Sequence, residues 1–392
     1  MRTYEETHPW IKFTAKLRES PTKLWILLGE CQSKCEHLAQ MPLRPDTARN
    51  LYKIYLAKGS LGTTAIEGNT LSEEEVLKHI EGKLHLPESR RYLAREVDNI
   101  IAGCNTLLEK IKDGKMPAIT PSTISHMNKT ILEGLDLEED VIPGELRKHS
   151  VVVGRYRGAP AEDLPYLMEH LCQWLSGEDF RPTHDLRIVY ALLKAVIAHL
   201  YLAWIHPFGD GNGRTARMLE FQVLISAGVP AVSAHLFSNH YNLTRQSYYR
   251  QLEKSSKSEG DILPFIEYAV QGFLDGLREQ IQFVINQQRD IIWRNFVHEY
   301  FRDKTSRSHI RRKHLILDLS RQPNPVPALK IPEISPRLAV AYSKCTRKTL
   351  IRDLNSMCRE GLIVKTENGY RVKREILLGF FPLRARDEND RN

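Results

Sequence analysis

Long runs of apolar positions at helical spacing dominate the first three quarters of this 392-residue chain. Residues 185–204 are apolar nearly all round and contain neither Pro nor Gly, which is typical of a buried helix. Residues 214–227 continue the helical pattern and end before Gly228 and Pro230, a usual C-terminal signal. A long amphipathic helix is expected over 264–285 or beyond. These patterns predict a mainly α-helical protein.

The length of the chain predicts more than one domain. We expect an N-terminal helical region over 1–112 and a central helical core over 113–288. A third domain of different composition is predicted over 289–380, followed by a flexible tail over 381–392.

The connection between the first two helices, HPFGDGNGRTAR at 206–217, contains the groups needed to bind a triphosphate. His206 can take a proton, because the ordinary pKa of histidine lies near neutrality. Asp210 is a hard oxygen ligand suited to Mg²⁺. Gly211 and Gly213 let backbone N–H groups approach an anion, and a helix that starts here points its N-terminus at a phosphate. The ordinary alternative is a plain turn, which does not need all of these groups in this order.

This segment resembles the signature of the Fic family, H-x-F-x-D/E-G-N-G-R-x-x-R, and fills every fixed position. The resemblance implies a helical protein that transfers AMP from ATP to a hydroxyl side chain of a target protein and releases pyrophosphate. It implies that His206 deprotonates the target Ser, Thr or Tyr and that Asp210 binds Mg²⁺. The nucleotide would be bound by the residues that follow, with Arg217 on the γ-phosphate: Gly211, Asn212, Gly213, Arg214, Thr215, Ala216 and Arg217.

The segments PGELR at 143–147 and SVVVGRY at 150–156 resemble the Fic flap, a hairpin that docks the backbone of the target. The β-branched run before Gly154 predicts a short strand, and an edge strand can receive another segment by strand addition. The alternative is an ordinary structural hairpin. Further nucleotide contacts are expected here from Val153, Gly154, Arg155 and Tyr156.

Two later segments, Tyr248-Tyr249 and residues 259–261, resemble the part of the family that lines the adenine pocket. Two adjacent residues of a helix cannot face the same way. We therefore expect one tyrosine to stack on adenine and the other to pack or hydrogen-bond. The alternative is that both tyrosines only pack.

The segment TTAIEGN at 63–69 resembles the Fic inhibitory motif, S/T-x-x-x-E-G/N, of the subclass that carries its own N-terminal inhibitory helix. Thr63 and Glu67 are four residues apart and share one helical face. We hypothesise that Glu67 pairs with Arg217, displaces the γ-phosphate and leaves ATP in a pose unsuited to in-line attack. The alternative is that Glu67 only occupies a helix end before Gly68.

Positive charge is concentrated near the C-terminus. Residues 304–374 contain 17 Lys and Arg but five Asp and Glu, a local net charge of +12 in a chain whose total is +8. This asymmetry favours a polyanionic partner. Residues 343–363 resemble the second half of a winged helix-turn-helix, and Asn368-Gly369 within 364–372 predicts the hairpin of its wing. The recognition helix would carry Thr346, Arg347, Lys348 and Arg352.

We therefore expect a mainly α protein with a Fic-type helical core, a short β-hairpin flap and a C-terminal winged helix-turn-helix domain. A winged helix can place its second helix in the major groove of DNA, although many such domains contact proteins or pack on a neighbouring domain. The six cysteines form no C-x-x-C pair and the start resembles no signal peptide, so we expect a cytoplasmic protein without a membrane partner.

The leading hypothesis is an ATP- and Mg²⁺-dependent protein adenylyltransferase that Glu67 inhibits. Its partners would be a target protein that presents a hydroxyl, DNA and, since Fic proteins of this subclass often dimerise, a second copy of the chain. Three other functions stay open: removal of AMP at the same site with Glu67 activating water, transfer of another nucleotide or phosphate-linked group, and regulation on DNA by a nucleotide-sensing Fic core.

Overall fold

The computed structural model describes residues 2–15, 17, 20–154, 156–183 and 185–377. The predicted tail at 381–392 lies outside the described residues. Contacts within the chain divide it into two compact units, Met1–Gln282 and Phe283–Asn392. Each unit has its own buried core, and the two are described separately.

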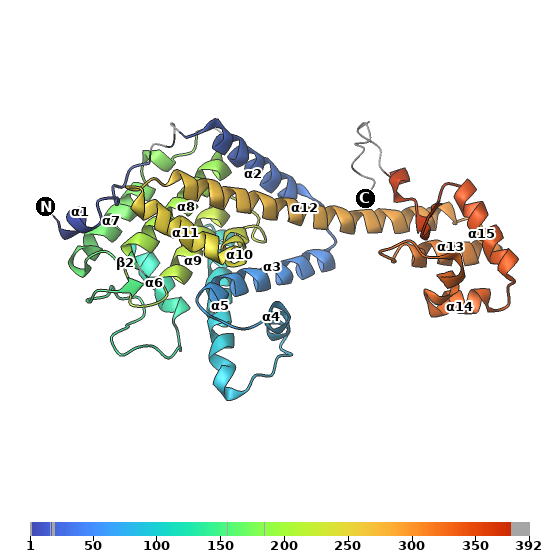
Figure 1. Ribbon diagram of the computed structural model, residues 1–392, viewed down its shortest axis with the longest axis horizontal. Coiled ribbons are helices and arrows are strands. Elements are labelled where there is room, and N and C mark those ends of the chain that lie inside the picture. The colour runs from blue at the N-terminus through green and yellow to red at the C-terminus, as the bar shows by residue number, and fades with distance from the viewer. Residues whose placement is uncertain (1, 16, 18–19, 155, 184, 378–392) are drawn as a thin grey trace. The chain divides into compact units, whose positions relative to one another are not determined.

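Unit 1 consists of helices and one short hairpin, which confirms the predicted mainly α fold (Figure 1). Its helices are α1 (Thr3–Thr7), α2 (Thr22–Gln40), α3 (Pro45–Ile66), α4 (Glu73–Ile80), α5 (Arg91–Lys112), α6 (Pro121–Ile131), α7 (Leu164–Leu175), α8 (Arg187–Ile205), α9 (Asn212–Ser226), α10 (Leu236–Leu243), α11 (Arg245–Lys257) and the first part of α12 (Leu263–Tyr300).

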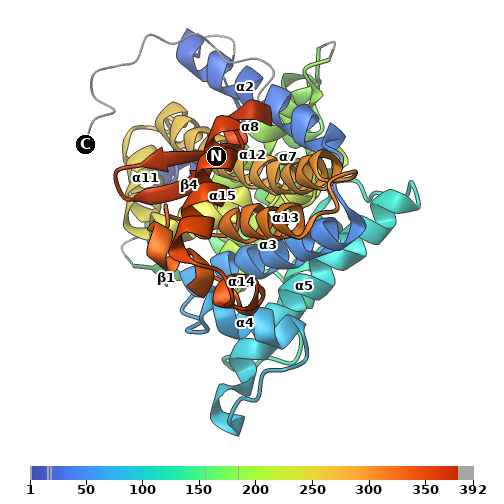
Figure 2. The same ribbon diagram turned by 90° about the vertical axis from the view of Figure 1, so that its right-hand side faces the viewer.

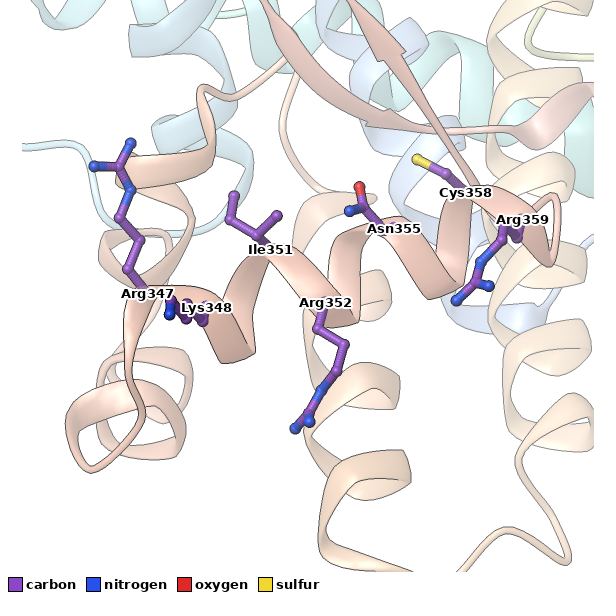
Figure 3. A pocket seen from close by; sticks show the side chains of 7 residues that line it. All are labelled: Arg347, Lys348, Ile351, Arg352, Asn355, Cys358 and Arg359. Atoms are coloured by element: carbon purple, nitrogen blue, oxygen red, sulfur yellow. The ribbon is translucent and has the colours of Figure 1, made fainter.

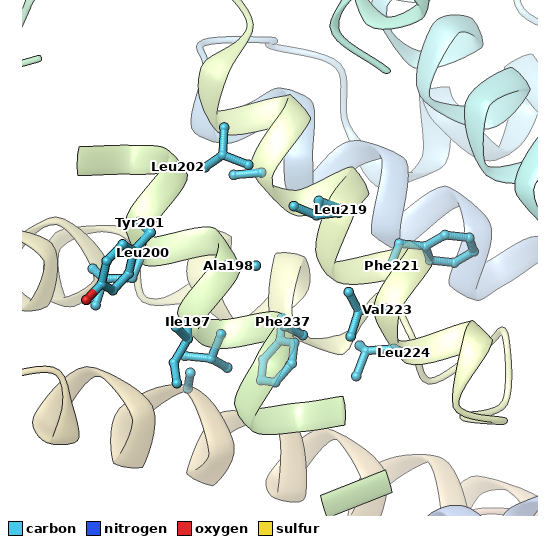
Figure 4. Close-up of a cluster of buried hydrophobic side chains, with 14 of the residues drawn as sticks. Ile197, Ala198, Leu200, Tyr201, Leu202, Leu219, Phe221, Val223, Leu224 and Phe237 are labelled. Carbon is cyan, nitrogen blue, oxygen red and sulfur yellow. The ribbon is translucent and has the colours of Figure 1, made fainter. Parts of the chain in front are cut away.

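The centre of unit 1 is formed by α8 and α9, the two helices that flank the signature segment. Figure 4 shows side chains of both helices in one apolar cluster with Phe237 of α10. Burial of each such side chain contributes roughly 1.5–3 kcal/mol, so the two helices are held firmly. Helix α8 is long and apolar enough to cross a membrane, but most of it is buried inside the protein, as in a core helix.

Helix α3 packs closely on α10 because two of its positions are glycine. A Cβ atom at Gly59 would overlap the His235 imidazole, and one at Gly62 would lie 3.1 Å from the carbonyl oxygen of Ser238. The helix ends at Ile66, and Glu67 is its C-cap, followed by Gly68 with φ +105°. The end of α3 is thereby brought close to the start of α9.

The predicted flap hairpin is present. Strand β1 (Val152–Val153) pairs antiparallel with β2 (Tyr156–Arg157), and Val153 lies opposite Tyr156. Upstream of the hairpin, Leu146 forms a bridge with Phe208. The flap segment is therefore joined by backbone hydrogen bonding to the signature segment.

Unit 2 contains the second part of α12, followed by helices and a hairpin in the order expected from the sequence (Figure 2). The elements are α13 (Arg307–Leu319), α14 (Pro336–Ser343), α15 (Arg347–Arg359), β3 (Ile363–Thr366) and β4 (Gly369–Val372). The predicted Asn-Gly hairpin is confirmed, since Thr366 pairs with Gly369 and Gly369 has φ +136°. The order agrees with a winged helix-turn-helix, whose assignment stays a prediction.

Candidate active site

His206 is the C-cap of α8 and directly follows its last residue, Ile205. It has left-handed backbone angles, φ 51° and ψ 60°, which are unfavourable for a residue with a Cβ atom. Its N–H donates to the Leu202 carbonyl at 2.9 Å. Burial lowers the pKa of the imidazole to about 4, against smaller opposite effects that include the charges of Glu67 and Asp210. His206 is therefore neutral near pH 7 and able to accept a proton.

A buried arginine from the flap segment fixes this backbone. Arg147 donates from Nε to the His206 carbonyl at 2.7 Å and from Nη1 to the His149 carbonyl at 2.6 Å, while Nη2 donates to the Ala159 carbonyl. Burial lowers the pKa of Arg147. The sequence placed Arg147 in the flap without a role, because its partners are up to 59 positions away.

Two asparagines hold the shape of the signature loop. Asn128 of α6 is fully buried; its Nδ2 donates to the Asp210 carbonyl at 2.9 Å, and its Oδ1 accepts from Gly144 N at 2.9 Å. Asn212 accepts from Phe208 N at 2.9 Å and donates to the Phe208 carbonyl at 2.8 Å. Asn128 was not predicted from the sequence, because nothing in a polar helix position reveals a partner 82 residues away.

Both signature arginines lie on α9 and are almost fully buried. Arg214 donates from Nη1 to Glu96 of α5 at 2.8 Å and from Nη2 to the Asp210 carboxylate at 3.2 Å. Among the residues that the structure describes, Nε of Arg214 and Nη1 of Arg217 are buried without a hydrogen-bond partner. The start of α9 therefore presents two unused cationic donors beside a helix N-terminus, a combination suited to an anion.

The predicted pairing of Glu67 with Arg217 is present. Arg217 donates from Nη2 to Glu67 Oε1 at 2.6 Å and to the Thr63 carbonyl at 3.0 Å, and from Nε to Thr63 Oγ1 at 2.7 Å. Burial by itself raises the pKa of Glu67, but the charge and hydrogen bond of Arg217, together with other nearby charges, bring the pKa below its usual value. Glu67 is therefore an anion near pH 7.

The same carboxylate lies over Gly213. A Cβ atom at Gly213 would overlap Glu67 Oε1 and would lie 3.0 Å from Arg217 Nη1. Only glycine permits a carboxylate or a phosphate oxygen to come this close to the first turn of α9. Glu67 thus occupies space that an anion bound at this helix N-terminus would need.

A cavity of about 540 Å³ opens beside His206 and Glu67, a volume suited to a small molecule such as a nucleotide. Its lining comes from the end of α3, from the flap, from the end of α8 with His206, from the first turn of α9 and from α11. The lining residues include Ile66, Glu67, Val153, Gly154, Tyr156, Trp204, His206, Gly213, Tyr248, Tyr249, Leu252, Glu253, Ser256 and Lys257.

The two tyrosines of α11 both line the cavity but differ in their surroundings, as expected from their adjacent positions. Tyr248 is buried, its ring stacks on Tyr241 at 4.8 Å, and its hydroxyl bonds His199 Nε2 at 2.9 Å. Tyr249 is 43% exposed, and its hydroxyl donates to the Ile66 carbonyl at 3.2 Å. Burial raises the pKa of Tyr248 far above its usual value, so its hydroxyl stays protonated.

Helix α11 also holds the end of α3. Arg245 donates from Nη1 to the Ala65 carbonyl at 3.2 Å and from Nη2 to the Ile66 carbonyl. These carbonyls belong to the last turn of α3, where the regular helical donors end, and the Ala65 carbonyl also accepts from Gly68 N at 3.0 Å. The helix that lines the cavity therefore also fixes the segment that carries Glu67.

The remaining predicted contacts are placed differently from the cavity. Of the predicted contacts in 211–217, Gly213 lines the cavity, whereas Gly211, Asn212, Arg214, Thr215, Ala216 and Arg217 are buried and do not line it. Arg214 and Arg217 instead line a separate hollow of about 10 Å³ together with Thr63. Glu259 lines a separate hollow near the N-terminal segment. Arg155 lies outside the described residues.

The Asp210 carboxylate is about half exposed at the mouth of the signature loop, next to Arg214. A carboxylate open to solvent can bind a hard cation that also contacts phosphates, which is the usual arrangement for Mg²⁺ in nucleotide sites. Within the described parts of the chain, no group of three His, Cys, Asp or Glu residues could hold a metal alone. A magnesium ion here would need ligands from a nucleotide and from water.

Comparison with known proteins identifies the helical core. Residues 118–224 match the Fic/DOC family. The chain is 26% identical over 271 residues to Protein adenylyltransferase fic-1 of Caenorhabditis elegans, covering 67% of this chain and 49% of that protein. It is 31% identical over 211 residues to Protein adenylyltransferase Fic of Culex quinquefasciatus, covering 53% of this chain and 38% of that protein. The chain thus spans about half the length, or less, of these relatives.

Solved structures share the fold. A Fic family protein from Desulfovibrio desulfuricans G20 superposes with a TM-score of 0.54 at 23% identity, over 90% of this chain and 95% of that one. A Fic-1 structure from Caenorhabditis elegans gives a TM-score of 0.55 at 24% identity, over 68% and 74%. With the signature in place between α8 and α9, residues 118–224 of this chain resemble a Fic domain in sequence and in fold.

Proposed function

We propose that this protein transfers AMP from ATP to a hydroxyl side chain of a target protein. The hydroxyl oxygen attacks the α-phosphorus, the bond from that phosphorus to the bridging oxygen of the β-phosphate breaks, and pyrophosphate leaves. His206 takes the hydroxyl proton, which its neutral form can accept. The relatives named as protein adenylyltransferases support this reaction.

The observation that carries the proposal is the pair of unused donors at the start of α9. Arg214 Nε and Arg217 Nη1 have no partner in the described part of the chain, although both are buried. A buried donor without a partner costs roughly 1–3 kcal/mol, which a phosphate oxygen would recover. In phosphoryl chemistry such charges position the phosphates and neutralise the charge that develops on them.

The adjoining cavity fits the rest of the nucleotide. It extends from Gly213, at the phosphate end, to Tyr249 and Leu252 on α11. The half-exposed Tyr249 ring is available for stacking on a base, whereas Tyr248 is already stacked on Tyr241. We therefore assign the stacking role to Tyr249 and the packing role to Tyr248.

We further propose that Mg²⁺ is held by Asp210 together with the phosphates. The cation would neutralise phosphate charge and stabilise the leaving pyrophosphate. Asp210 is oriented for this by Arg214, which donates to both of its carboxylate oxygens at 3.2 Å.

We propose that Glu67 inhibits the reaction. Its carboxylate accepts a hydrogen bond from Arg217 and lies over Gly213, where a terminal phosphate would be expected. A terminal phosphate bound there would have to displace Glu67 from Arg217, because the carboxylate and the phosphate are both anions and cannot occupy the same position. The same carboxylate lines the cavity with His206, so removal of AMP by a water molecule that Glu67 activates is the second candidate function.

The test uses purified full-length protein with ATP labelled either at the α- or at the γ-phosphate. We expect Glu67→Gly to increase self-labelling from α-labelled ATP by about tenfold or more. Removal of a competing interaction of about 1.4 kcal/mol raises the affinity for the productive ATP pose about tenfold. No label should transfer from γ-labelled ATP, since the γ-phosphate leaves in pyrophosphate. His206→Ala in the same background should abolish labelling.

Glu81→Gly is the matched control, because Glu81 also caps the end of a helix, α4, but does not line the cavity. It should leave labelling at the wild-type level. Transfer of γ-label would contradict the proposed AMP transfer. Equal labelling by Glu67→Gly and wild type would contradict the proposed inhibition. Loss of AMP from pre-labelled protein that requires Glu67 would favour the second candidate.

A further inference from the structure

One face of α15 in unit 2 carries a row of cations directed at solvent. Figure 3 shows seven side chains that project from successive turns of the helix and line an open hollow of about 1020 Å³. They are Arg347, Lys348, Ile351, Arg352, Asn355, Cys358 and Arg359. Four of the seven are cations and none is an acid.

These four cations are not used to stabilise the unit. In the part of the chain that the structure describes, Arg347, Lys348, Arg352 and Arg359 have no ion pair and no side-chain hydrogen bond. The neighbouring helix behaves differently, since Arg311 and Arg312 of α13 bind Asp353 at 2.7 and 2.9 Å.

Helix α15 separates its charges between two faces. Leu350, Leu354 and Met357 point into the core of unit 2, and with them the fully buried Asp353. The one acid of the helix is therefore neutralised inside the unit by the two arginines of α13. The outer face is left with positive charge alone, which gives a local attraction for anions.

The composition of this face favours a polyanion over a protein partner. The centre of a protein interface is usually apolar and depleted of charge, whereas Ile351 and Cys358 are the apolar members here and both are partly buried. A helix of 13 residues is about 20 Å long, and the major groove of duplex DNA, about 12 Å wide, admits a helix. The hairpin after the helix adds Lys365, which is exposed.

We propose that α15 binds duplex DNA in the major groove, with Arg347, Lys348, Arg352 and Arg359 contacting phosphates. Asn355 lies among them on the same face and can reach a base edge. This inference does not depend on the proposed AMP transfer, because it rests on residues of unit 2 alone.

The test measures binding of the full-length protein to a labelled duplex of about three helical turns by fluorescence anisotropy over a range of salt concentrations. We expect Arg347→Gln/Lys348→Gln/Arg352→Gln to raise Kd about thirtyfold or more. The slope of log Kd against log salt should decrease by about three, one for each cation that the variant removes from the phosphates. Arg347→Lys/Arg352→Lys, which retains the charge, should stay within about threefold of wild type, since phosphate contacts need charge first.

A matched control removes three exposed lysines of unit 1, Lys53→Gln/Lys83→Gln/Lys112→Gln, and lowers the net charge equally. It should change Kd by about twofold or less. An equal loss in the control, no binding of duplex at low salt, or tighter binding of single-stranded RNA than of duplex would each overturn the proposal. Self-labelling by the α15 variant in the Glu67→Gly background should be unchanged, which separates this outcome from failure of the proposed transfer.

Discussion

At the scale of single residues, the site is defined by the hydrogen-bond partners of Arg217. This guanidinium is buried, and Thr63 and Glu67 accept all of its hydrogen bonds from Nε and Nη2. Nη1 remains without a partner among the described residues. The side chain is thus fixed in place by α3 and still has one donor available for an anion.

The pH dependence of self-labelling on the acid side should reflect the burial of His206. Burial lowers the pKa of this imidazole to about 4, and loss of the Glu67 charge removes one influence that raises it. Protonation of His206 at low pH removes the catalytic base. With excess magnesium, kcat/KM for self-labelling by Glu67→Gly should therefore stay level from about pH 8 to about pH 5.5 and decrease only below that range. A limb centred near the ordinary histidine value, about 6.5, would contradict this assignment.

Replacement of the flap arginine should affect both stability and rate. Arg147→Lys retains the charge but cannot donate to several carbonyls at once. We expect the free energy of unfolding to decrease by about 2–3 kcal/mol in urea titrations, because buried carbonyls lose their donors. Self-labelling in the Glu67→Gly background should also decrease, since the His206 carbonyl is one of them.

The control for this change is Arg157→Lys, on an exposed position of the same hairpin. It should alter stability by about 0.5 kcal/mol or less. Equal stability of the two variants would show that Arg147 does not fix the loop.

At the scale of elements, three helices set the position of Glu67. Helix α3 carries the residue at its C-terminal end, α10 packs against Gly59 and Gly62, and α11 binds the last carbonyls through Arg245. The cavity is lined by α11 as well. A change in how α3 packs should therefore change the inhibition.

Gly59→Ala should loosen the packing of α3 on α10. The added Cβ would overlap the buried His235 ring, so we expect a decrease of about 1–3 kcal/mol in the free energy of unfolding. Displacement of α3 should weaken the contact between Glu67 and Arg217 and increase self-labelling from ATP. Thermal unfolding and labelling assays measure the two effects.

Gly29→Ala provides the comparison, because no atom lies within 4 Å of a Cβ at this position of α2. It should raise stability by up to about 1 kcal/mol through higher helix propensity, with no change in labelling. If Gly59→Ala behaved in the same way, close packing of α3 on α10 would not control the site.

At the scale of the whole molecule, two units have separate cores and different charge. The net charge is +12 for residues 304–374 and +8 for the whole chain, so the remainder of the chain carries −4. Trp293, Leu315 and Leu354 belong to the core of unit 2, whereas Phe208 and Ala216 of the signature segment belong to the core of unit 1. The two proposals therefore place the nucleotide on unit 1 and the DNA on unit 2, which makes them separately testable.

Hydrogen exchange should separate the two ligands. In Glu67→Gly, ATP with magnesium should slow exchange in 206–217 and in 248–257, because binding stabilises the segments that line the cavity. A DNA duplex should slow exchange in Arg347–Arg359. Protection of α15 by ATP, or of the signature segment by DNA, would contradict the assignment of one ligand to each unit.

Several elements could be predicted because their causes are local. Helices α8 and α9 follow from apolar periodicity, and the hairpin β3–β4 follows from Asn368-Gly369. Phosphate binding by 206–217 was predicted from its own residue types and stays a prediction. The contact of Glu67 with Arg217, 150 positions apart, was predicted by a family resemblance and not by any property of the intervening chain.

Arg147, Asn128, Glu96 and Arg245 were not predicted, although each holds part of the site. Each acts through a hydrogen bond to a group 59 to 180 positions away. Side-chain type and spacing report which face of a helix is apolar, but they carry no information on which distant carbonyl or guanidinium a polar group will meet.

The order of residues in this chain was sufficient to locate the chemistry: a histidine, a carboxylate, glycines and two arginines between two core helices, and a basic segment near the C-terminus. The folded arrangement alone revealed that the arginines retain unused donors, that α11 holds the end of α3 and that the cations of α15 face solvent. The reason is physical, because helix formation and apolar burial follow local patterns, whereas the pairing of buried polar groups depends on how whole helices pack.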